Sequence, residues 1–237
     1  MLDPHGRVIL ISGANRGIGF AVTESLYAKG YTVSLGVRDP QKLSSAIAHW
    51  NELRLQTAHY EATDWRTHAA WVESAVERFG RIDGLVNNAG IASKGTVRDI
   101  EEAELDRIFA VNCKAPLNMI RHALPHLEES GAGRIVNVAS LSGKRVRNDH
   151  VAYNMSKFAV MALTHSLRRL GWEKGIRATA LCPSFVRTDM TTGSSRIAAE
   201  LMSDPKDIAE LVATLIALPN TAAVAELLVN CRLEDMV

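Results

Sequence analysis

The chain alternates between short runs of apolar residues and longer segments in which apolar residues recur every three or four positions. The short runs are rich in β-branched residues and are bounded by glycine or polar residues, which is typical of strands buried on both faces of a sheet. The longer segments have the spacing of helices with one apolar face. We therefore predict strands over residues 8–11, 31–37, 53–60, 82–86, 134–138, 176–181 and 226–230.

Helices are predicted between these strands, over residues 20–29, 41–51, 64–79, 101–129, 152–173 and 205–218. Gly30 stands where the first helix should end, and Pro205 stands just inside the start of the last one. Pro116 is expected to bend the long helix over 101–129. The unbroken alternation predicts an α/β fold, with a doubly wound parallel β-sheet and helices on both faces, formed by one domain over residues 1–237.

Composition and charge limit the classes of function. Lys and Arg total 27 and Asp and Glu total 26, so we expect neither a nucleic-acid nor a membrane-surface partner. The most apolar late stretch, residues 208–229, includes Glu210, Pro219 and Glu226, which argues against a membrane span. The three cysteines lack metal-ligand spacing and the N-terminus lacks a basic segment followed by an apolar one, so we expect a cytoplasmic protein without a metal site.

A glycine-rich turn follows the first predicted strand. Glycines stand at positions 13, 17 and 19, directly before a helical segment. Such glycines permit a tight turn and close approach of the backbone to a pyrophosphate, which the N–H groups of the helix N-terminus would then bind. The spacing departs from the common G-x-G-x-x-G pattern, and a glycine triplet alone is also consistent with a simple turn.

Four motifs in chain order make the pattern specific. They are the turn over residues 12–19, the run Asn87-Asn88-Ala89-Gly90 after the fourth strand, Ser140 at the end of the fifth strand, and Tyr153 followed four residues later by Lys157. Together they resemble the short-chain dehydrogenase/reductase family over essentially the whole chain. The resemblance implies a Rossmann-type oxidoreductase with a nicotinamide cofactor and a small-molecule alcohol or carbonyl substrate.

The chemistry follows from the residue types. Interconversion of an alcohol and a carbonyl needs a group that donates or accepts a proton, and a free tyrosine has a pKa of ~10. Tyr153 and Lys157 would share one face of a helix, so the ammonium is expected to favour the phenolate and lower that pKa. Ser140 would donate a hydrogen bond to the substrate oxygen. The resemblance further implies that Lys157 holds the nicotinamide ribose and that Asn112 positions a water that passes protons to it.

The resemblance also assigns a cofactor site. It comprises Gly13, Asn15, Arg16, Gly17, Ile18, Gly19, Arg38, Asp64, Asn88, Ala89, Gly90, Tyr153, Lys157, Pro183, Val186 and Thr188, with Asp64 at the adenine. Relatives that prefer NAD carry an acid where this chain has Val37, and the following Arg38 can pair with a 2′-phosphate, as can Arg16. NADP(H) is therefore favoured, whereas a ribose facing Asp39 would instead favour NAD(H).

The substrate side is less determined by the sequence. We expect a pocket formed by residues 91–96, 141–151, Phe185 and the loop 189–204, with Leu141, Phe185 and Met190 as apolar components and Gly193-Ser194-Ser195 as part of a mobile lid. Lys144, Arg145 and Arg147 could attract an anionic substrate or form a solvated basic loop, and His150 could bind a substrate. Ser184 replaces a glycine that is usual in the family.

Three further interpretations remain. The resemblance implies a homodimer or homotetramer formed by the helices over 101–129 and 152–173. A non-catalytic sensor of nicotinamide redox state would also bind the dinucleotide, but it would not require Tyr153 or Ser140. Another Rossmann-like class, such as a methyltransferase, would leave the pairing of Tyr153 with Lys157 unexplained.

Overall fold

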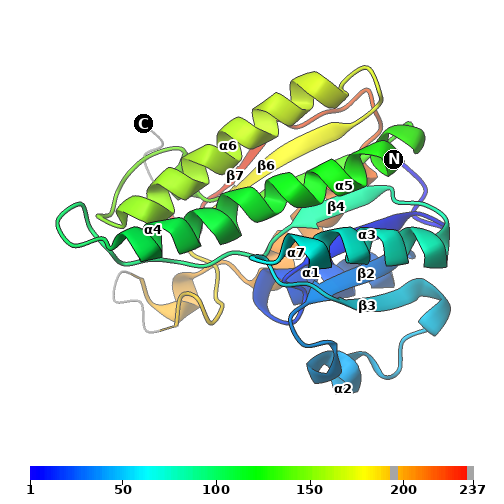
Figure 1. The fold of residues 1–237 in the computed structure, drawn as a ribbon, viewed down its shortest axis with the longest axis horizontal. Helices are drawn as coiled ribbons and strands as arrows, with labels where there is room; N and C mark the ends of the chain where they lie inside the picture. Colours follow the sequence, from blue (N-terminus) through cyan, green and yellow to red (C-terminus); the bar gives the residue numbers. More distant parts are fainter. Residues whose placement is uncertain (193–196, 234–237) are drawn as a thin grey trace.

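The computed structural model describes residues 1–192 and 197–233, and its centre is a sheet of seven strands (Figure 1). The strand order is β3-β2-β1-β4-β5-β6-β7, and all neighbouring strands are parallel. The strands are β1 (Val8–Ser12), β2 (Thr32–Val37), β3 (Leu55–His59), β4 (Gly84–Asn87), β5 (Arg134–Val138), β6 (Arg177–Pro183) and β7 (Glu226–Val229). Because the order reverses between β1 and β4, the sheet is doubly wound, which confirms the predicted fold class.

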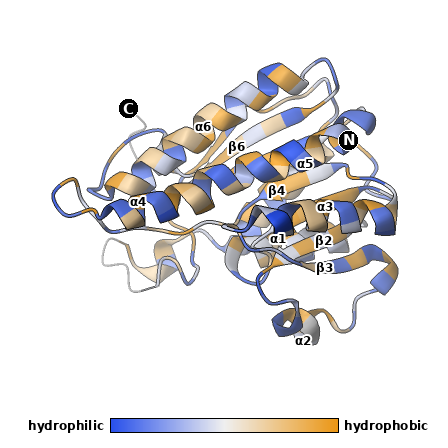
Figure 2. Ribbon diagram, in the orientation of Figure 1, coloured by the Kyte–Doolittle hydropathy of each residue, from blue (hydrophilic) through white to orange (hydrophobic). Residues whose placement is uncertain are grey.

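Helices cover both faces of the sheet (Figure 1). One layer contains α1 (Gly17–Ala28) and α7 (Pro205–Ala217), and the other contains α3 (Trp65–Phe79), α5 (Ala115–Glu129) and α6 (Val151–Gly171). Successive side chains of β1 point to opposite layers, so Ile9 and Ile11 pack in the core beneath α1 and α7, whereas Val8 and Leu10 pack beneath α3 and α5. The helices of the second layer carry hydrophobic and hydrophilic residues in turn (Figure 2), as expected for helices with one buried face.

The segment after β2 differs from its prediction. In place of a helix over 41–51, the chain forms a 3₁₀ turn at Pro40–Leu43, one turn of helix in α2 (Ser44–Ile47), and a second 3₁₀ turn at Glu52–Arg54. Leu43 and Ile47 are the buried apolar residues of this segment. Two apolar anchors do not supply enough packing to stabilise three turns of helix. Further 3₁₀ turns lie at Leu141–Gly143 and Ala199–Leu201.

The long helix over 101–129 is interrupted, but not in the way the sequence predicts. It consists of α4 (Glu102–Phe109), a π-helical segment at Ala110–Lys114, and α5. Pro116 lies in the first turn of α5. In an α-helix the N–H of residue 116 would bond the carbonyl of residue 112, and proline has no N–H. The irregularity therefore falls before Pro116, around Asn112.

Over residues 1–192 and 197–233, no helix combines the length and the apolar composition that a membrane span requires.

Candidate active site

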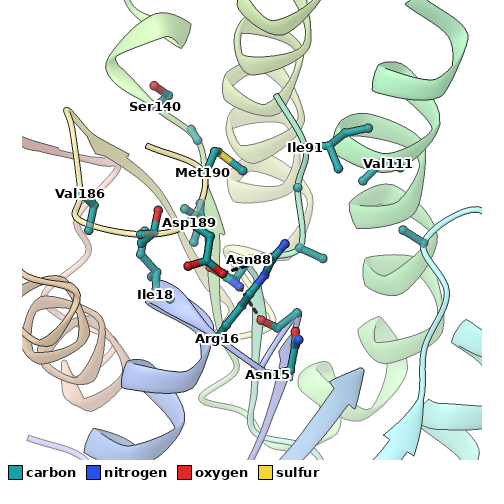
Figure 3. Close-up of a pocket in the computed structure, with 18 of the residues that line it drawn as sticks. Asn15, Arg16, Ile18, Asn88, Ile91, Val111, Ser140, Val186, Asp189 and Met190 are labelled. Carbon is teal, nitrogen blue, oxygen red and sulfur yellow. Dashed lines mark hydrogen bonds and ion pairs between the residues drawn. The ribbon is translucent and has the colours of Figure 1, made fainter. Parts of the chain in front are cut away.

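A cavity of about 450 Å³ opens at the carboxyl ends of the central strands (Figure 3). Its walls come from the turn after β1, the ends of β2, β4 and β5, helix α6 and the loop after β6. The predicted site residues that line it are Gly13, Asn15, Arg16, Gly17, Ile18, Arg38, Asn88, Ala89, Gly90, Ser140, Tyr153, Lys157, Pro183, Val186 and Thr188. Gly19, Asp64 and Asn112 lie outside this lining, and each has another structural role.

The glycine turn is built by close packing. Gly13 has a φ of +66°, a conformation that favours glycine. Gly19 lies below the cavity, where an added Cβ would overlap the carbonyl oxygen of Gly13 and the side-chain nitrogen of Asn88. Gly19 therefore permits α1 to approach the turn and does not itself face the cavity. Arg16 is the N-cap of α1 and makes no side-chain capping bond, so the first N–H groups of this helix are left without a side-chain cap.

Hydrogen bonds join this turn to the segment after β4. The Ser12 hydroxyl accepts the backbone N–H groups of Asn88 at 3.0 Å and of Ala89 at 3.1 Å. The Asn88 side chain donates to the carbonyl oxygens of Ser12 at 3.0 Å and Gly13 at 3.2 Å. These four bonds hold the ends of two neighbouring strands together and form the floor of the cavity.

Tyr153 and Lys157 lie one turn apart on α6 and both line the cavity, in agreement with their spacing. The Lys157 Nζ lies 5.6 Å from the centre of the Tyr153 ring and donates a hydrogen bond of 2.9 Å to the carbonyl oxygen of Val138. Lys157 is only 7% exposed. Burial lowers the pKa of Lys157 from 10.5 to about 8, because removing an ammonium from water disfavours its charged form.

The pKa of Tyr153 departs from the prediction. Burial raises the pKa of this phenol, and the hydrogen-bonding side chain of Ser140 opposes the increase. The predicted lowering by Lys157 is wrong for this arrangement, because desolvation of the phenolate outweighs the opposing effects and the ammonium is directed to Val138. Tyr153 is thus a phenol at neutral pH, with Ser140 beside it.

Asn112 lies behind the cavity wall and is 2% exposed. Its side chain accepts the N–H of Ile91 at 2.9 Å, and donates to the Ile91 carbonyl at 2.9 Å and to the Ser156 hydroxyl at 3.0 Å. A Cβ added to Gly90 would lie 3.3 Å from Asn112 Oδ1 and 3.9 Å from Lys157 Nζ, so a side chain at this position would contact both groups. Asn112 therefore fixes the segment after β4 against α6.

Asp64, which was predicted to contact the adenine, does not line the cavity. Asp64 caps α3 by accepting the N–H of Arg66 at 3.1 Å, and also pairs with the Arg66 side chain. The residues that line the cavity here are Tyr60, Glu61, Ala62 and Thr63, just before Asp64. Asp64 is a typical N-cap residue, which is the signal in the sequence that could have indicated the shift.

The two side chains that decide the predicted cofactor preference are also separated. Arg38 is exposed and lines the cavity, whereas Asp39 is not part of the lining. The Asp39 carboxylate accepts the N–H of Gln41 at 3.2 Å and lies 3.5 Å from Lys42 Nζ. Sequence reasoning missed Arg107 and Val111 as lining residues, because both come from a helical segment brought to the cavity by tertiary packing.

Of the residues predicted for the substrate pocket, Ile91, Asp189 and Met190 line this cavity. Ser184, which replaces the glycine usual in the family, lines it as well. Leu141 does not, because it is buried in a small core with Val160 and Met161. Phe185 also lies outside the lining, and the predicted lid residues 193–195 lie outside the described residues.

The basic loop after Ser140 has a structural partner. Lys144 Nζ lies 2.6 Å from Glu226 Oε2 on β7, and His165 Nε2 lies 2.7 Å from Glu226 Oε1. Lys144 is therefore held at the edge of the sheet and is not part of the cavity lining. His150 and Arg147 make interactions of their own, so neither is an uncommitted group.

Comparison with known proteins places these features in context. A family model described as short chain dehydrogenase matches residues 7–198. An agropine synthesis reductase of Rhizobium rhizogenes is 46% identical over 230 residues, which are 97% of this chain and 53% of that protein. The chain thus spans about half the length of that relative. An uncharacterized oxidoreductase of Staphylococcus saprophyticus is 30% identical over 233 residues, which are 97% of this chain and 99% of the relative.

Solved structures agree with the fold. A 3-ketoacyl-(acyl-carrier-protein) reductase from Brucella melitensis, complexed with NADH, has a TM-score of 0.88 and 29% identity, with 96% of this chain and 98% of that chain covered. An alcohol dehydrogenase from Thermococcus sibiricus, complexed with 5-hydroxy-NADP, has a TM-score of 0.85 and 26% identity, with 94% and 95% covered.

Proposed function

The chain belongs to the short-chain dehydrogenase/reductase family of oxidoreductases, and we propose that it is an NADP(H)-dependent member that interconverts an alcohol and a carbonyl group on a small molecule. The observation that carries the proposal is the convergence of Ser140, Tyr153 and Lys157 on the cavity that also contains the glycine turn. NADH and an NADP analogue are bound by two structural relatives, which supports a nicotinamide cofactor for this chain.

The residues present fit a dinucleotide. The N-terminus of α1 has no side-chain cap, so its N–H groups and its positive dipole end can bind a pyrophosphate. Gly13 and Gly17 have positive φ, and a Cβ at either would press on Ala89 or Thr188, so these glycines permit the tight turn. Gly90 leaves space beside Lys157 where a side chain would crowd Asn112. In this proposal Asn15, Ile18, Asn88 and Ala89 line the dinucleotide, and Pro183, Val186 and Thr188 contact its carboxamide and phosphate groups.

A bound nicotinamide supplies or accepts the hydride. Tyr153 then serves as the general acid or base at the substrate oxygen, and Ser140 donates a hydrogen bond to the same oxygen. Tyr153 is protonated at neutral pH, since its pKa is raised above the usual value, and can therefore donate to the alkoxide that develops in the reductive direction. The relative from Rhizobium rhizogenes is also named as a reductase, which supports this direction.

Protons reach Tyr153 through Lys157 in this proposal. The lowered pKa of Lys157, about 8, allows the ammonium to give up a proton near neutral pH. Because Pro116 has no N–H, the Asn112 carbonyl lacks the donor that a regular α-helix would supply, and in this proposal that oxygen holds a water that passes protons to Lys157. Asn112 acts here as a positioning residue, and its side-chain bonds to Ile91 and Ser156 keep it in place.

The preference for NADP(H) is supported by Arg38, which lines the cavity, and by the position of Asp39, whose carboxylate is held by Gln41 and Lys42. We also propose a homodimer or homotetramer formed through α5 and α6, on which Leu117, Met155 and Phe158 are 43%, 48% and 44% exposed. Residues 1–237 would form one domain, and the three free thiols are consistent with a cytoplasmic location.

The test is a fluorescence titration of the protein with NADPH and NADH, followed by turnover assays with a panel of aldehydes and ketones. We expect much tighter binding of NADPH and turnover of at least one carbonyl compound. Equal or tighter binding of NADH would overturn the cofactor preference. Tight dinucleotide binding without any turnover would favour a redox sensor, and absence of dinucleotide binding would overturn the proposal.

A further inference from the structure

An ion pair lies at the end of the cavity that is lined by Arg16 and Arg38, where we propose that the 2′-phosphate binds and which we call the nucleotide end. Arg16 Nη1 lies 2.8 Å from Asp189 Oδ2 (Figure 3). Arg16 immediately precedes α1, whereas Asp189 belongs to the loop after β6, 173 positions later in the chain. Both residues line the cavity, so the ion pair joins two of its walls.

The loop that carries Asp189 is held against the glycine turn. The Thr191 hydroxyl is hydrogen-bonded to the carbonyl oxygens of Val186 at 2.7 Å and Thr188 at 2.9 Å, and it accepts the N–H of Thr188 at 3.1 Å. A Cβ added to Gly17 would lie 3.2 Å from Thr188 Cγ2, so the loop and the turn are in contact. Asp189 is therefore presented to Arg16 by an ordered turn.

Two other charged residues, Arg38 and Glu61, line this end of the cavity. Arg38 stands two residues beyond Gly36, which is paired in register with Ser12 on the neighbouring strand, so Arg38 and Arg16 follow adjacent strand ends. Glu61 is the second acid of the lining, and its carboxylate accepts the N–H and hydroxyl of Thr63 at 3.3 and 3.1 Å. Asp189 is thus the lining acid that is ion-paired with a residue of the nucleotide end.

We propose that Asp189 determines how strongly this chain discriminates NADPH from NADH, by competing with the 2′-phosphate for Arg16. The inference rests on the proposed function, which places a dinucleotide in this cavity. A guanidinium binds phosphate best through two parallel N–H bonds, and the bond from Nη1 to Asp189 removes part of that fork. The carboxylate also places a negative charge next to the phosphate.

The effect of this competition on NADPH affinity should be small, because both side chains are well exposed, at 64% for Arg16 and 68% for Asp189. Exposed ion pairs change equilibria by about two- to fivefold, and salt screens them. We therefore expect Asp189→Asn to tighten NADPH binding by about two- to fivefold at low salt. Binding of NADH, which has no 2′-phosphate, should not change.

The experiment measures Kd for NADPH and NADH by fluorescence titration, at low and high salt, for four proteins: the wild type, Asp189→Asn, Arg16→Met and the double variant. Asp204→Asn is the matched control. It removes a nearby acid that pairs with Arg187 outside the cavity lining, and asparagine preserves its capping of α7. The control should leave both dissociation constants unchanged.

A gain specific to NADPH that disappears at high salt and in the Arg16→Met background supports the inference. Unchanged NADPH binding, equal changes for both dinucleotides, or a gain that persists without Arg16 would overturn it. Failure of the proposed cofactor preference is distinguishable, because it appears in the wild type as tighter binding of NADH. The effect of Asp189→Asn on the NADPH/NADH ratio can still be read in that case.

Discussion

The polar side chains at the two ends of the cavity differ in their exposure to water. We call the end that contains Tyr153 and Lys157 the catalytic end. At the nucleotide end, Arg16, Arg38 and Asp189 are exposed, so water screens their interactions. At the catalytic end, Lys157 and Asn112 are buried and each is hydrogen-bonded to backbone carbonyl groups. We therefore expect that changing one charge at the nucleotide end alters the affinity for the dinucleotide by a small factor. At the catalytic end, burial of a charged group changes its pKa and the stability of the fold.

The largest effect is expected at the catalytic end. Tyr153→Phe removes the proposed proton donor and should lower kcat by about 10²- to 10⁴-fold, with the Kd for NADPH nearly unchanged. Steady-state kinetics and cofactor titration measure the two quantities. Tyr27→Phe is the control, since the Tyr27 hydroxyl accepts the N–H of Asn51 outside the cavity lining. Full activity of Tyr153→Phe would show that the assigned mechanism is wrong.

A second large effect is expected at Gly19, which lies below the nucleotide end in a closely packed part of the glycine turn. Gly19→Ala places a methyl group against the carbonyl of Gly13 and the side chain of Asn88, so the turn must shift. We expect dinucleotide affinity to fall more than tenfold and the free energy of unfolding to fall by about 1–3 kcal/mol. Denaturant unfolding and titration measure these changes. Gly80→Ala, with open space around its Cβ but a φ of +74°, should also lower stability while leaving dinucleotide affinity intact. An equal loss of affinity there would argue against the packing explanation.

The burial of Lys157 predicts a pH dependence of stability. Because its pKa is lowered from 10.5 to about 8, the unfolded chain binds more protons than the folded chain between these values, and stability rises with pH. Relative to Lys157→Met, the wild type should gain about 2 kcal/mol in free energy of unfolding between about pH 7 and about pH 9.5. Urea unfolding at both pH values measures the difference, with Lys29→Met as a reference for loss of an exposed lysine. A difference that does not vary with pH would mean that the ammonium is not buried as described.

A smaller effect, which still exceeds that of Asp189→Asn, concerns Arg38 at the nucleotide end. Arg38→Met should weaken NADPH binding by about three- to tenfold and leave NADH binding unchanged, because an exposed arginine contributes a charge-assisted bond that water partly screens. Asp39→Asn is the comparison, and it should alter neither affinity, since Asp39 bonds Gln41 and Lys42. If Asp39→Asn weakened NADH binding, the ribose would lie on Asp39 and the preference would have to be reassigned.

Local patterns determined most of the fold. Apolar runs identified all seven strands, and the fifth was predicted with its observed bounds, Arg134–Val138. The weakest prediction was the segment after β2, where helical spacing existed but Leu43 and Ile47 were the only buried apolar anchors among its described residues. Pro116 was correctly identified as a disturbance, although it produces a π-helical segment before it in place of the expected bend.

The sequence alone determined the positions of the glycine turn, of Ser140 and of the Tyr153–Lys157 pair, because strand ends and helical spacing are local properties. The tertiary structure decided three other features: the partners of Lys144 and Arg16, the replacement of Asp64 by the residues before it at the cavity, and the direction of the Tyr153 pKa shift. Ion pairs between distant segments and the loss of water around a side chain depend on which surfaces meet on folding, and residue spacing does not encode that information.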